Sequence, residues 1–158
     1  MTYFPNDARL AIVVSRFNEE VTDALLQGAL ARLKQHAIAA EKVKVVSVAG
    51  AVEIPIIAQT LIKTGHYEAV IALGAVIRGD TSHYDYVCQQ VSYGCQQVAL
   101  STNVPVIFGV LTTDNTEQAL ARAGGDHGNK GSDAVDTALE MVATMRQLKQ
   151  STFATVNS

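Results

Sequence analysis

The segment from Val70 to Val87 combines the residue types of a phosphate site with a proton carrier. An apolar run from Val70 to Ile77, long enough for one buried strand, breaks into the polar sequence RGDTSH at positions 78–83, and a helical pattern follows. Free backbone N–H groups and the dipole at a helix N-terminus attract anions. Imidazole rings gain and lose protons near neutral pH. We therefore expect a phosphate-binding loop with His83 as proton-transfer residue; an exposed helix-start histidine is the structural alternative.

Two other places carry residues that suit a planar, polar ligand. Gly50 and Ala51 precede Glu53-Ile54-Pro55, which predicts a helix that begins at a small-residue turn with exposed N–H groups. A plain strand-to-helix turn, with Glu53 favouring the helix dipole, explains the same residues. Phe17 follows the first predicted strand and can stack on a heterocycle, whereas a core aromatic is the alternative for Phe17 and also for Phe108.

The sequence lacks the motifs of nucleotide binding, zinc binding and disulfide formation. The segment GGDHGNKG at 124–131 lacks the spacing of a nucleotide P-loop, and no GxGxxG follows the first strand. The histidines and cysteines form no cluster with the spacing of a zinc site. Cys88 and Cys95 lie two turns apart on one predicted helix, roughly 10 Å, too far for a disulfide. We therefore expect two small buried thiols and no metal.

The elements that must position these residues alternate along the chain. Apolar, β-branched runs predict strands at Leu10–Ser15, Val43–Val48, Val70–Ile77 and Val104–Leu111. Helical patterns and end signals predict helices over 20–36, from Pro55 to about Thr64, from Ser82 to about Leu100, over 116–123 and from Ser132 to about Lys149. Residues 124–131 are expected as a loop, and the polar tail after Gln150 is expected to fray.

Four apolar strands separated by helices predict a four-stranded parallel sheet covered on both faces. With right-handed crossovers this is a three-layer α/β/α, doubly wound fold, formed by one domain over residues 1–158. Such folds place their chemistry outside the carboxyl ends of the strands. The first three strand exits read SRFN at 15–18, AGAVE at 49–53 and RGDTSH at 78–83, so the site is predicted at this edge.

Composition narrows the function classes. The net charge of −3 leaves no basic stripe for a nucleic-acid backbone, which argues against a nucleic-acid partner. No apolar stretch reaches the length of a membrane span, and MTYFPNDARL has no signal-peptide pattern, so a cytoplasmic protein is expected. The charged fraction of 17% beside 48% hydrophobic residues indicates apolar surface that other subunits cover.

Five blocks in this order resemble the lumazine synthase family. They are SRFN at 15–18, GAVEIP at 50–55, ALGAVIRG at 72–79 with Thr81 and His83, FGVLT at 108–112, and RAG at 122–124 followed by GNKG at 128–131. The resemblance covers about residues 8–148. It implies a flavodoxin-like sheet and a transferase that needs neither a metal nor an organic cofactor.

The resemblance also implies a reaction and a set of site residues. The family joins 5-amino-6-(D-ribitylamino)uracil to 3,4-dihydroxy-2-butanone 4-phosphate, giving 6,7-dimethyl-8-ribityllumazine, phosphate and water in riboflavin biosynthesis. His83 would move protons. The substrate-binding residues would be Phe17 stacked on the pyrimidine, Asn18 and Gly50 in the same site, Ala51, Val52 and Glu53 at the ribityl side and pyrimidine edge, Ala75, Val76 and Ile77 around the ring, Asp80 and Thr81 at the phosphate, and Phe108, Arg122 and Lys130 from a neighbouring subunit.

Assembly follows from the same resemblance. The family forms pentamers, sometimes stacked as decamers or closed into shells of sixty subunits, and the compact 124–131 segment resembles that of the shell-forming members. Riboflavin synthase is a further expected partner. One departure concerns the phosphate loop, where many relatives have a small residue in place of Asp80. Its side chain is expected to point outward or to pair with Arg78.

Two other functions fit a similar fold. In a flavin- or nucleotide-binding carrier, we would expect a phosphate loop rich in Ser and Thr after the first strand, and SRFN at 15–18 is not such a loop. A flavin bound after purification would favour it. A shell-forming scaffold without catalysis predicts a particle but no turnover.

Overall fold

The computed structural model describes the backbone of residues 4–157 and the side chains as far as residue 150. The elements are β1 (Leu10–Ser15), α1 (Glu19–Gln35), β2 (Val43–Val48), α2 (Ile54–Lys63), β3 (Ala69–Ile77), α3 (His83–Thr102), β4 (Val106–Thr113), α4 (Thr116–Ala121), β5 (Ala123–Gly125), β6 (Gly128–Asn129) and α5 (Lys130–Asn157), with short 3₁₀ helices η1 (Ala40–Lys42) and η2 (Ala51–Glu53). No helix in this described part is long and apolar enough to cross a membrane.

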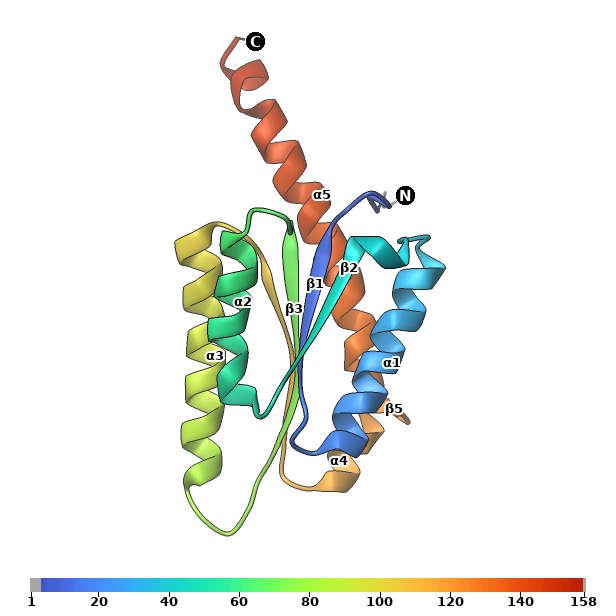
Figure 1. Ribbon diagram of the computed structural model, residues 1–158, viewed down its shortest axis with the longest axis vertical. Coiled ribbons are helices and arrows are strands. Elements are labelled where there is room, and N and C mark those ends of the chain that lie inside the picture. The colour runs from blue at the N-terminus through green and yellow to red at the C-terminus, as the bar shows by residue number, and fades with distance from the viewer. Residues whose placement is uncertain (1–3, 158) are drawn as a thin grey trace.

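The main sheet has the strand order β2-β1-β3-β4, and every neighbouring pair is parallel. Helices α2 and α3 lie on one face, whereas α1 and α5 lie on the other (Figure 1). This arrangement confirms the predicted three-layer, doubly wound fold. All four carboxyl ends point to the same edge, where the β3–α3 loop and α4 are found (Figure 1).

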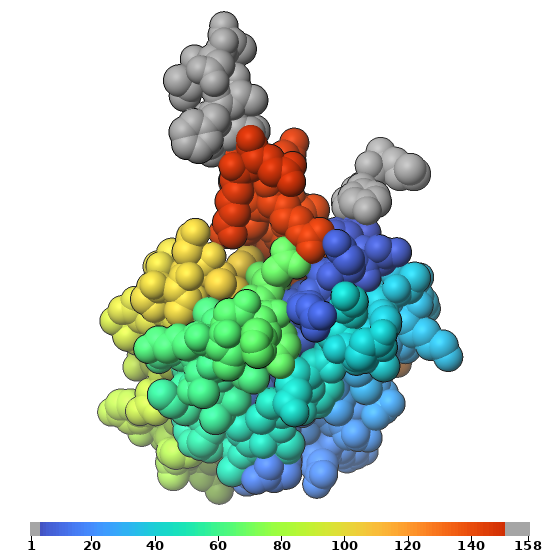
Figure 2. Space-filling model, turned by 45° about the horizontal axis from the view of Figure 1, so that its top comes forward, coloured from blue at the N-terminus to red at the C-terminus, as the bar shows by residue number. Residues whose placement is uncertain are grey.

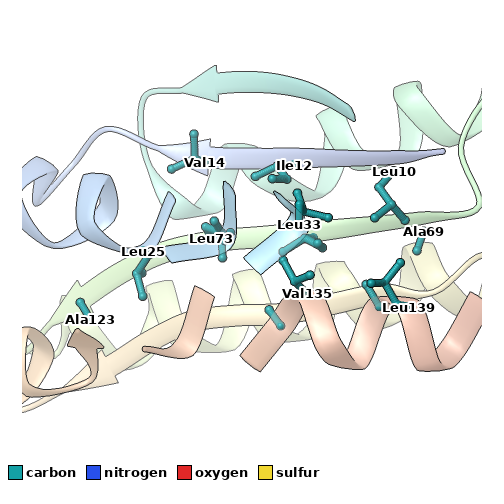
Figure 3. Packing of buried hydrophobic residues seen from close by; sticks show 14 of the residues in the cluster. Leu10, Ile12, Val14, Leu25, Leu33, Ala69, Leu73, Ala123, Val135 and Leu139 are labelled. Carbon is teal, nitrogen blue, oxygen red and sulfur yellow. The ribbon is translucent and has the colours of Figure 1, made fainter. Parts of the chain in front are cut away.

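The central strands are buried on both faces, which explains their continuous apolar sequences. Along β1, Leu10 and Ile12 face α1 and α5, whereas Ala11 and Val13 face α2 and α3. Strand β3 alternates in the same way. Figure 3 shows Leu10, Ile12 and Leu73 of the strands together with Val135 and Leu139 of α5 as members of one cluster of buried hydrophobic residues. Two separate cores therefore hold the central strands rigid at the edge where they end.

Asn129 and Gly131 join the start of α5 to α1. The Asn129 side chain accepts from the N–H groups of Gly131 (2.8 Å) and Ser132 (3.1 Å), and it donates to the Ala24 oxygen at 3.1 Å. A Cβ on Gly131 would lie 2.0 Å from the Leu25 oxygen, so only glycine allows this approach. The GNKG sequence thus has a structural role.

Several element boundaries differ from the prediction, and the larger differences have identifiable causes. Strand β4 begins at Val106 because α3 extends to Thr102, where Asn103 (φ 59°) ends it, and because Pro105 lacks an N–H. Helix α4 ends at Ala121. Part of the expected 124–131 loop is the antiparallel hairpin of β5 and β6. Helix α5 continues past the expected end at Lys149 to Asn157, since neither Gly nor Pro interrupts it.

Ion pairs fasten the N-terminal end of the sheet, away from the predicted site. Arg146 of α5 donates to Glu68 at 2.8 Å and 2.5 Å and to Asp7 at 2.9 Å. On the other side of α5, Asp136 accepts from Arg32 and lies 2.8 Å from Nε2 of His36, both on or next to α1. The C-terminal part of α5 extends beyond the body of the molecule (Figures 1 and 2).

Candidate functional site

A hollow of about 390 Å³, called the first hollow below, lies where β1 and β3 end and α3 begins. Its walls come from the three strand exits that the sequence singled out. They comprise Phe17, Asn18, Gly50, Ala51, Val52, Ala75, Val76, Ile77, Gly79, Thr81, His83, Tyr84 and Val87. The structure thus brings together ten of the predicted site residues in one place.

The turn after β1 presents Phe17 to this hollow. The N–H groups of Arg16 and Phe17 donate to the oxygens of Val48 (2.8 Å) and Ala49 (3.0 Å), which ties the turn to the end of β2. The Asn18 amide then bonds the Ala75 oxygen at 2.9 Å. Phe17 remains 72% exposed, so the alternative of a core aromatic is wrong for this residue. Its ring is free to stack on a ligand.

Glu53 does not line the first hollow, in contrast to the role that the resemblance implies. Its carboxylate accepts a 2.9 Å hydrogen bond from the N–H of Gly50. The N–H of Gly50 is therefore occupied, in contrast to the exposed N–H groups expected at this helix start. Ala51 and Val52 do line the hollow, and they are the residues of η2 that can contact a bound ring.

The loop between β3 and α3 forms the opposite wall. Oγ1 of Thr81 accepts from the N–H of His83 at 3.2 Å, and both residues line the hollow. Asp80 is exposed and does not line the hollow, which agrees with the expectation that its side chain points outward. The other expectation, an ion pair with Arg78, is wrong, because Arg78 pairs with Asp85 and Asp114.

Arg122 and Lys130 line a different cavity. This second hollow, of about 430 Å³, lies at the end of β4 and is also bounded by Gln118, His127 and Asp133. Nη1 of Arg122 donates to the Gln118 oxygen at 2.9 Å. Phe108 lies farther along β4 in a groove of about 520 Å³ that also includes Lys130. The three residues expected to act from a neighbouring subunit therefore gather along the open β4 edge.

The two hollows differ in charge. Among the side chains the structure describes, neither Arg nor Lys lines the first hollow, whereas two cations line the second. Thr81, His83 and Tyr84 are polar side chains that line the first hollow at its α3 end. A phosphate dianion bound there would have no lysine or arginine of the same chain within the cavity wall.

The sequence prediction missed some lining residues. Tyr84 and Val87 lie on the first turn of α3 beside His83, and the spacing of four between His83 and Val87 was the available signal. Burial raises the pKa of Tyr84. Gln118, His127 and Asp133 of the second hollow carry no such signal. Within the described side chains, no group of three His, Cys, Asp or Glu could hold a metal ion.

Comparison with known proteins gives one consistent result. The profile of the family described as 6,7-dimethyl-8-ribityllumazine synthase matches residues 7–146. A protein of that name from Coxiella burnetii strain RSA 493 is 59% identical over 141 residues, which cover 89% of this chain and 93% of the relative. The corresponding protein of the Dugway strain is 58% identical over the same share of both chains.

Proposed function

The chain belongs to the 6,7-dimethyl-8-ribityllumazine synthase family, and from that premise we propose which residues act in the reaction and how the sites are assembled. The protein is a transferase of riboflavin biosynthesis. It condenses 5-amino-6-(D-ribitylamino)uracil with 3,4-dihydroxy-2-butanone 4-phosphate, and the products are 6,7-dimethyl-8-ribityllumazine, phosphate and water. Family membership favours this enzyme over the carrier and the scaffold.

The first hollow would hold the pyrimidine and the reacting carbon atoms. Its wall is mainly apolar, and the exposed ring of Phe17 offers a stacking surface for the heterocycle. Ala51, Val52, Ala75, Val76 and Ile77 would shape the cavity around the ring and the ribityl chain. Holding two substrates together in such a cavity accounts for much of the rate enhancement expected of a condensing enzyme.

His83 would move the protons. The amine of the pyrimidine attacks the ketone and forms an imine with loss of water. Loss of a proton from the neighbouring hydroxyl-bearing carbon then expels the phosphate and leaves an enol, which becomes a ketone by proton transfer. The ribitylamine nitrogen closes the ring on this new carbonyl with loss of a second water. Each step transfers protons to or from nitrogen and oxygen atoms, which suits an imidazole at the cavity wall. The Thr81 hydroxyl and the start of α3 would hold the phosphate.

One observation carries the proposal for assembly: the histidine and the cations lie in different hollows of one chain. A leaving phosphate needs positive charge nearby. We therefore infer that Arg122, Lys130 and Phe108 of one copy complete the first hollow of the next copy. The repeated use of two different surfaces builds a ring. Exposed apolar side chains on α2 and α3, among them Ile56 and Leu100, agree with a covering subunit.

Co-expression of two inactive variants tests this arrangement. His83→Ala and Arg122→Ala, carrying different tags, are produced together, and mixed oligomers are purified by both tags. Sites shared between copies restore the intact pairing of His83 with Arg122 in about a quarter of the positions of a random ring. The expected result is lumazine fluorescence well above that of either variant alone at low butanone phosphate. No recovery in purified mixed oligomers would show that both residues serve the same chain's site.

The size of the assembly is a second part of the proposal. We expect pentameric rings closed into a shell of sixty subunits, because the short connection between β5 and β6 resembles that of shell-forming members. Sedimentation or light scattering at the mass of one pentamer would rule out the shell. A cytoplasmic location agrees with the two free thiols, Cys88 and Cys95. Riboflavin synthase, which consumes the product, is the proposed protein partner.

A further inference from the structure

Arg78 belongs to the loop that we assign to the phosphate, yet its guanidinium is bonded elsewhere. Nε donates to Oδ1 of Asp114 at 3.0 Å, and Nη1 lies 3.7 Å from Oδ1 of Asp85. The same guanidinium carbon lies 4.3 Å from the centroid of the Tyr84 ring. The hydrogen bond to Asp114 raises the pKa of Arg78. Two carboxylates and an aromatic face therefore already hold this cation.

The contacts of Arg78 join three segments of the site. Asp85 and Tyr84 lie in the first turn of α3, directly after His83. Asp114 follows β4, and the backbone N–H of Arg78 donates to the Thr113 oxygen of the same segment at 2.9 Å. Arg78 itself follows β3. The Arg78 side chain thus connects the end of β3, where it lies, with the start of α3 and with the residue that follows β4.

The loop from 79 to 82 depends on this fastening. Its four residues are exposed, and a Cβ added at Gly79 would contact nothing within 4 Å. Among the described residues, the hydrogen bonds of this loop are local: Thr81 accepts from the N–H of His83, and Ser82 accepts from that of Asp85. The long-range hydrogen bonds next to this loop are made by Arg78, the residue that directly precedes it.

The bonds continue to the second hollow. The N–H of Asp114 donates to the side-chain Oε1 of Gln118 at 2.8 Å, and the main-chain oxygen of Gln118 accepts from Nη1 of Arg122 at 2.9 Å. The side chain that fastens the phosphate loop is therefore bonded to the segment that orients the proposed phosphate cation. A shift of Asp114 would disturb both walls, which belong to two different sites if the sites are shared between copies.

We propose that Arg78 is a positioning residue that holds Thr81 and His83 in their working places through Asp114, and that it does not bind the phosphate itself. The inference rests on the proposed function, because it concerns the loop assigned to the phosphate. A planar guanidinium that lies over the Tyr84 ring, bonds Asp114 and forms an ion pair with Asp85 has no equivalent in a lysine ammonium. A misplacement of about 1 Å at a reacting group costs up to about 100-fold in rate.

Asp114→Asn separates this role from direct phosphate binding. If Arg78 is a positioning residue, loss of the Asp114 charge weakens the fastening, so kcat falls and KM for the butanone phosphate rises, with kcat/KM down about tenfold. If Arg78 binds phosphate, loss of a competing carboxylate leaves kcat/KM unchanged or increases it. The two roles therefore predict opposite signs for the same substitution.

The full experiment uses the assembled enzyme and four further variants. Arg78→Gln is expected to lose at least as much activity as Asp114→Asn, because it also removes the contacts with Asp85 and Tyr84. The double variant is expected to lose no more than Arg78→Gln alone, because both substitutions break the contact between Arg78 and Asp114. Arg78→Lys is expected to recover only part of the activity. Glu117→Gln, which changes a neighbouring exposed carboxylate, is the matched control and should behave as the unchanged enzyme. Thermal unfolding and sedimentation confirm that each variant folds and assembles.

The outcomes distinguish this inference from the proposed function. If the unchanged enzyme forms no lumazine, the function itself is wrong. If it turns over normally and Asp114→Asn equals or exceeds it, or if Arg78→Lys is fully active, the positioning role is wrong. Additive losses in the folded double variant would likewise show that the two residues act separately.

Discussion

The side-chain amide of Asn18 donates a 2.9 Å hydrogen bond to the main-chain oxygen of Ala75, joining the exits of β1 and β3. Asn18 also has a φ of 64°, in the left-handed region that asparagine and glycine tolerate best. The turn that presents Phe17 therefore depends on this residue in two ways, through its side chain and through its backbone.

We expect Asn18→Ala to lower the free energy of unfolding by about 1–3 kcal/mol, because it loses the hydrogen bond and adds left-handed strain. Asn18→Gly loses the same bond without the strain and is the matched comparison. It should fall between Asn18→Ala and the unchanged chain in urea unfolding. Equal stability of all three would contradict both contributions.

The strands were predictable because apolar, β-branched runs leave a strong local pattern, both in the buried central strands and in the partly exposed edge strand β2. Leu10–Ser15 and Val43–Val48 have the predicted bounds, since continuous β-branched runs are flanked by polar residues. The first hollow was predictable for a related reason: in a parallel sheet, the ends of the strands meet at one edge. These two rules gave the fold and the edge of the sheet at which the site lies, whereas Ala75, Val76 and Ile77 came from the family resemblance.

Side-chain partners across the chain were not predictable in this way. The bond of Arg78 to Asp114 spans 36 residues and depends on β4 lying beside β3. Asn129 looks like part of a glycine-rich loop, but it caps α5 and bonds Ala24 of α1, 105 residues away. Such pairs leave no periodic signal, because each is fixed by tertiary packing.

His83→Ala should reduce kcat by about 10²–10⁴-fold, the usual contribution of a general acid or base. Stability should change by less than about 0.5 kcal/mol, because His83 is exposed at the start of α3. Steady-state lumazine fluorescence and thermal unfolding measure the two effects. His66→Ala, at an exposed histidine before β3, is the control and should leave both unchanged. A fully active His83→Ala would remove the assigned role.

Asp80→Asn should lower KM for the butanone phosphate. The exposed carboxylate of Asp80 lies between Gly79 and Thr81, which line the first hollow, so it repels a bound phosphate dianion. For an exposed charge the effect is about 0.3–1 kcal/mol, or about two- to fivefold in KM.

Added salt should shrink this difference, because exposed charges are screened. Asp23→Asn, on the exposed face of α1, is the control for a general change in net charge. A KM that stays the same for Asp80→Asn at low salt would mean that this carboxylate lies too far from the phosphate to matter.

Because of the buried thiol of Cys95, the free energy of unfolding should fall at alkaline pH. Burial raises the pKa of its thiol from 9.0 to about 11. Between those values the unfolded chain gives up the proton and the folded chain keeps it, so stability is complete below about pH 9 and falls as the pH rises to about 11. The rise corresponds to about 2.7 kcal/mol.

Urea unfolding at pH 8 and pH 10.5 measures this loss. Cys95→Ala starts from a lower stability but should lose less of it between the two pH values. Parallel losses in both proteins would contradict the assignment to this thiol. A thiol reagent should also label Cys95 slowly in the folded protein and rapidly in urea, because the thiolate is the reactive form.

Ser15 and Gly74 allow a test of packing beneath the first hollow. Ser15 is 1% exposed, and its hydroxyl has no hydrogen-bond partner among the described residues. A Cβ at Gly74 would lie 2.9 Å from that hydroxyl and 3.5 Å from Ile54 and Val110, so the hydroxyl is its closest obstacle. Removing an unpaired buried hydroxyl is neutral or favourable, so Ser15→Ala should raise the free energy of unfolding by about 0–1 kcal/mol.

Gly74→Ala alone should lower the free energy of unfolding by about 1–3 kcal/mol, because the new methyl group meets the hydroxyl. The double variant Ser15→Ala/Gly74→Ala should be more stable than the sum of the two single effects, since the obstacle is gone. Ser47→Ala, at an exposed serine that bonds Arg16, is the control and should not rescue Gly74→Ala. Urea unfolding of the four proteins gives the coupling. Simple additivity of Ser15→Ala and Gly74→Ala would show that strain at Gly74 arises from the backbone or from Ile54 and Val110 instead.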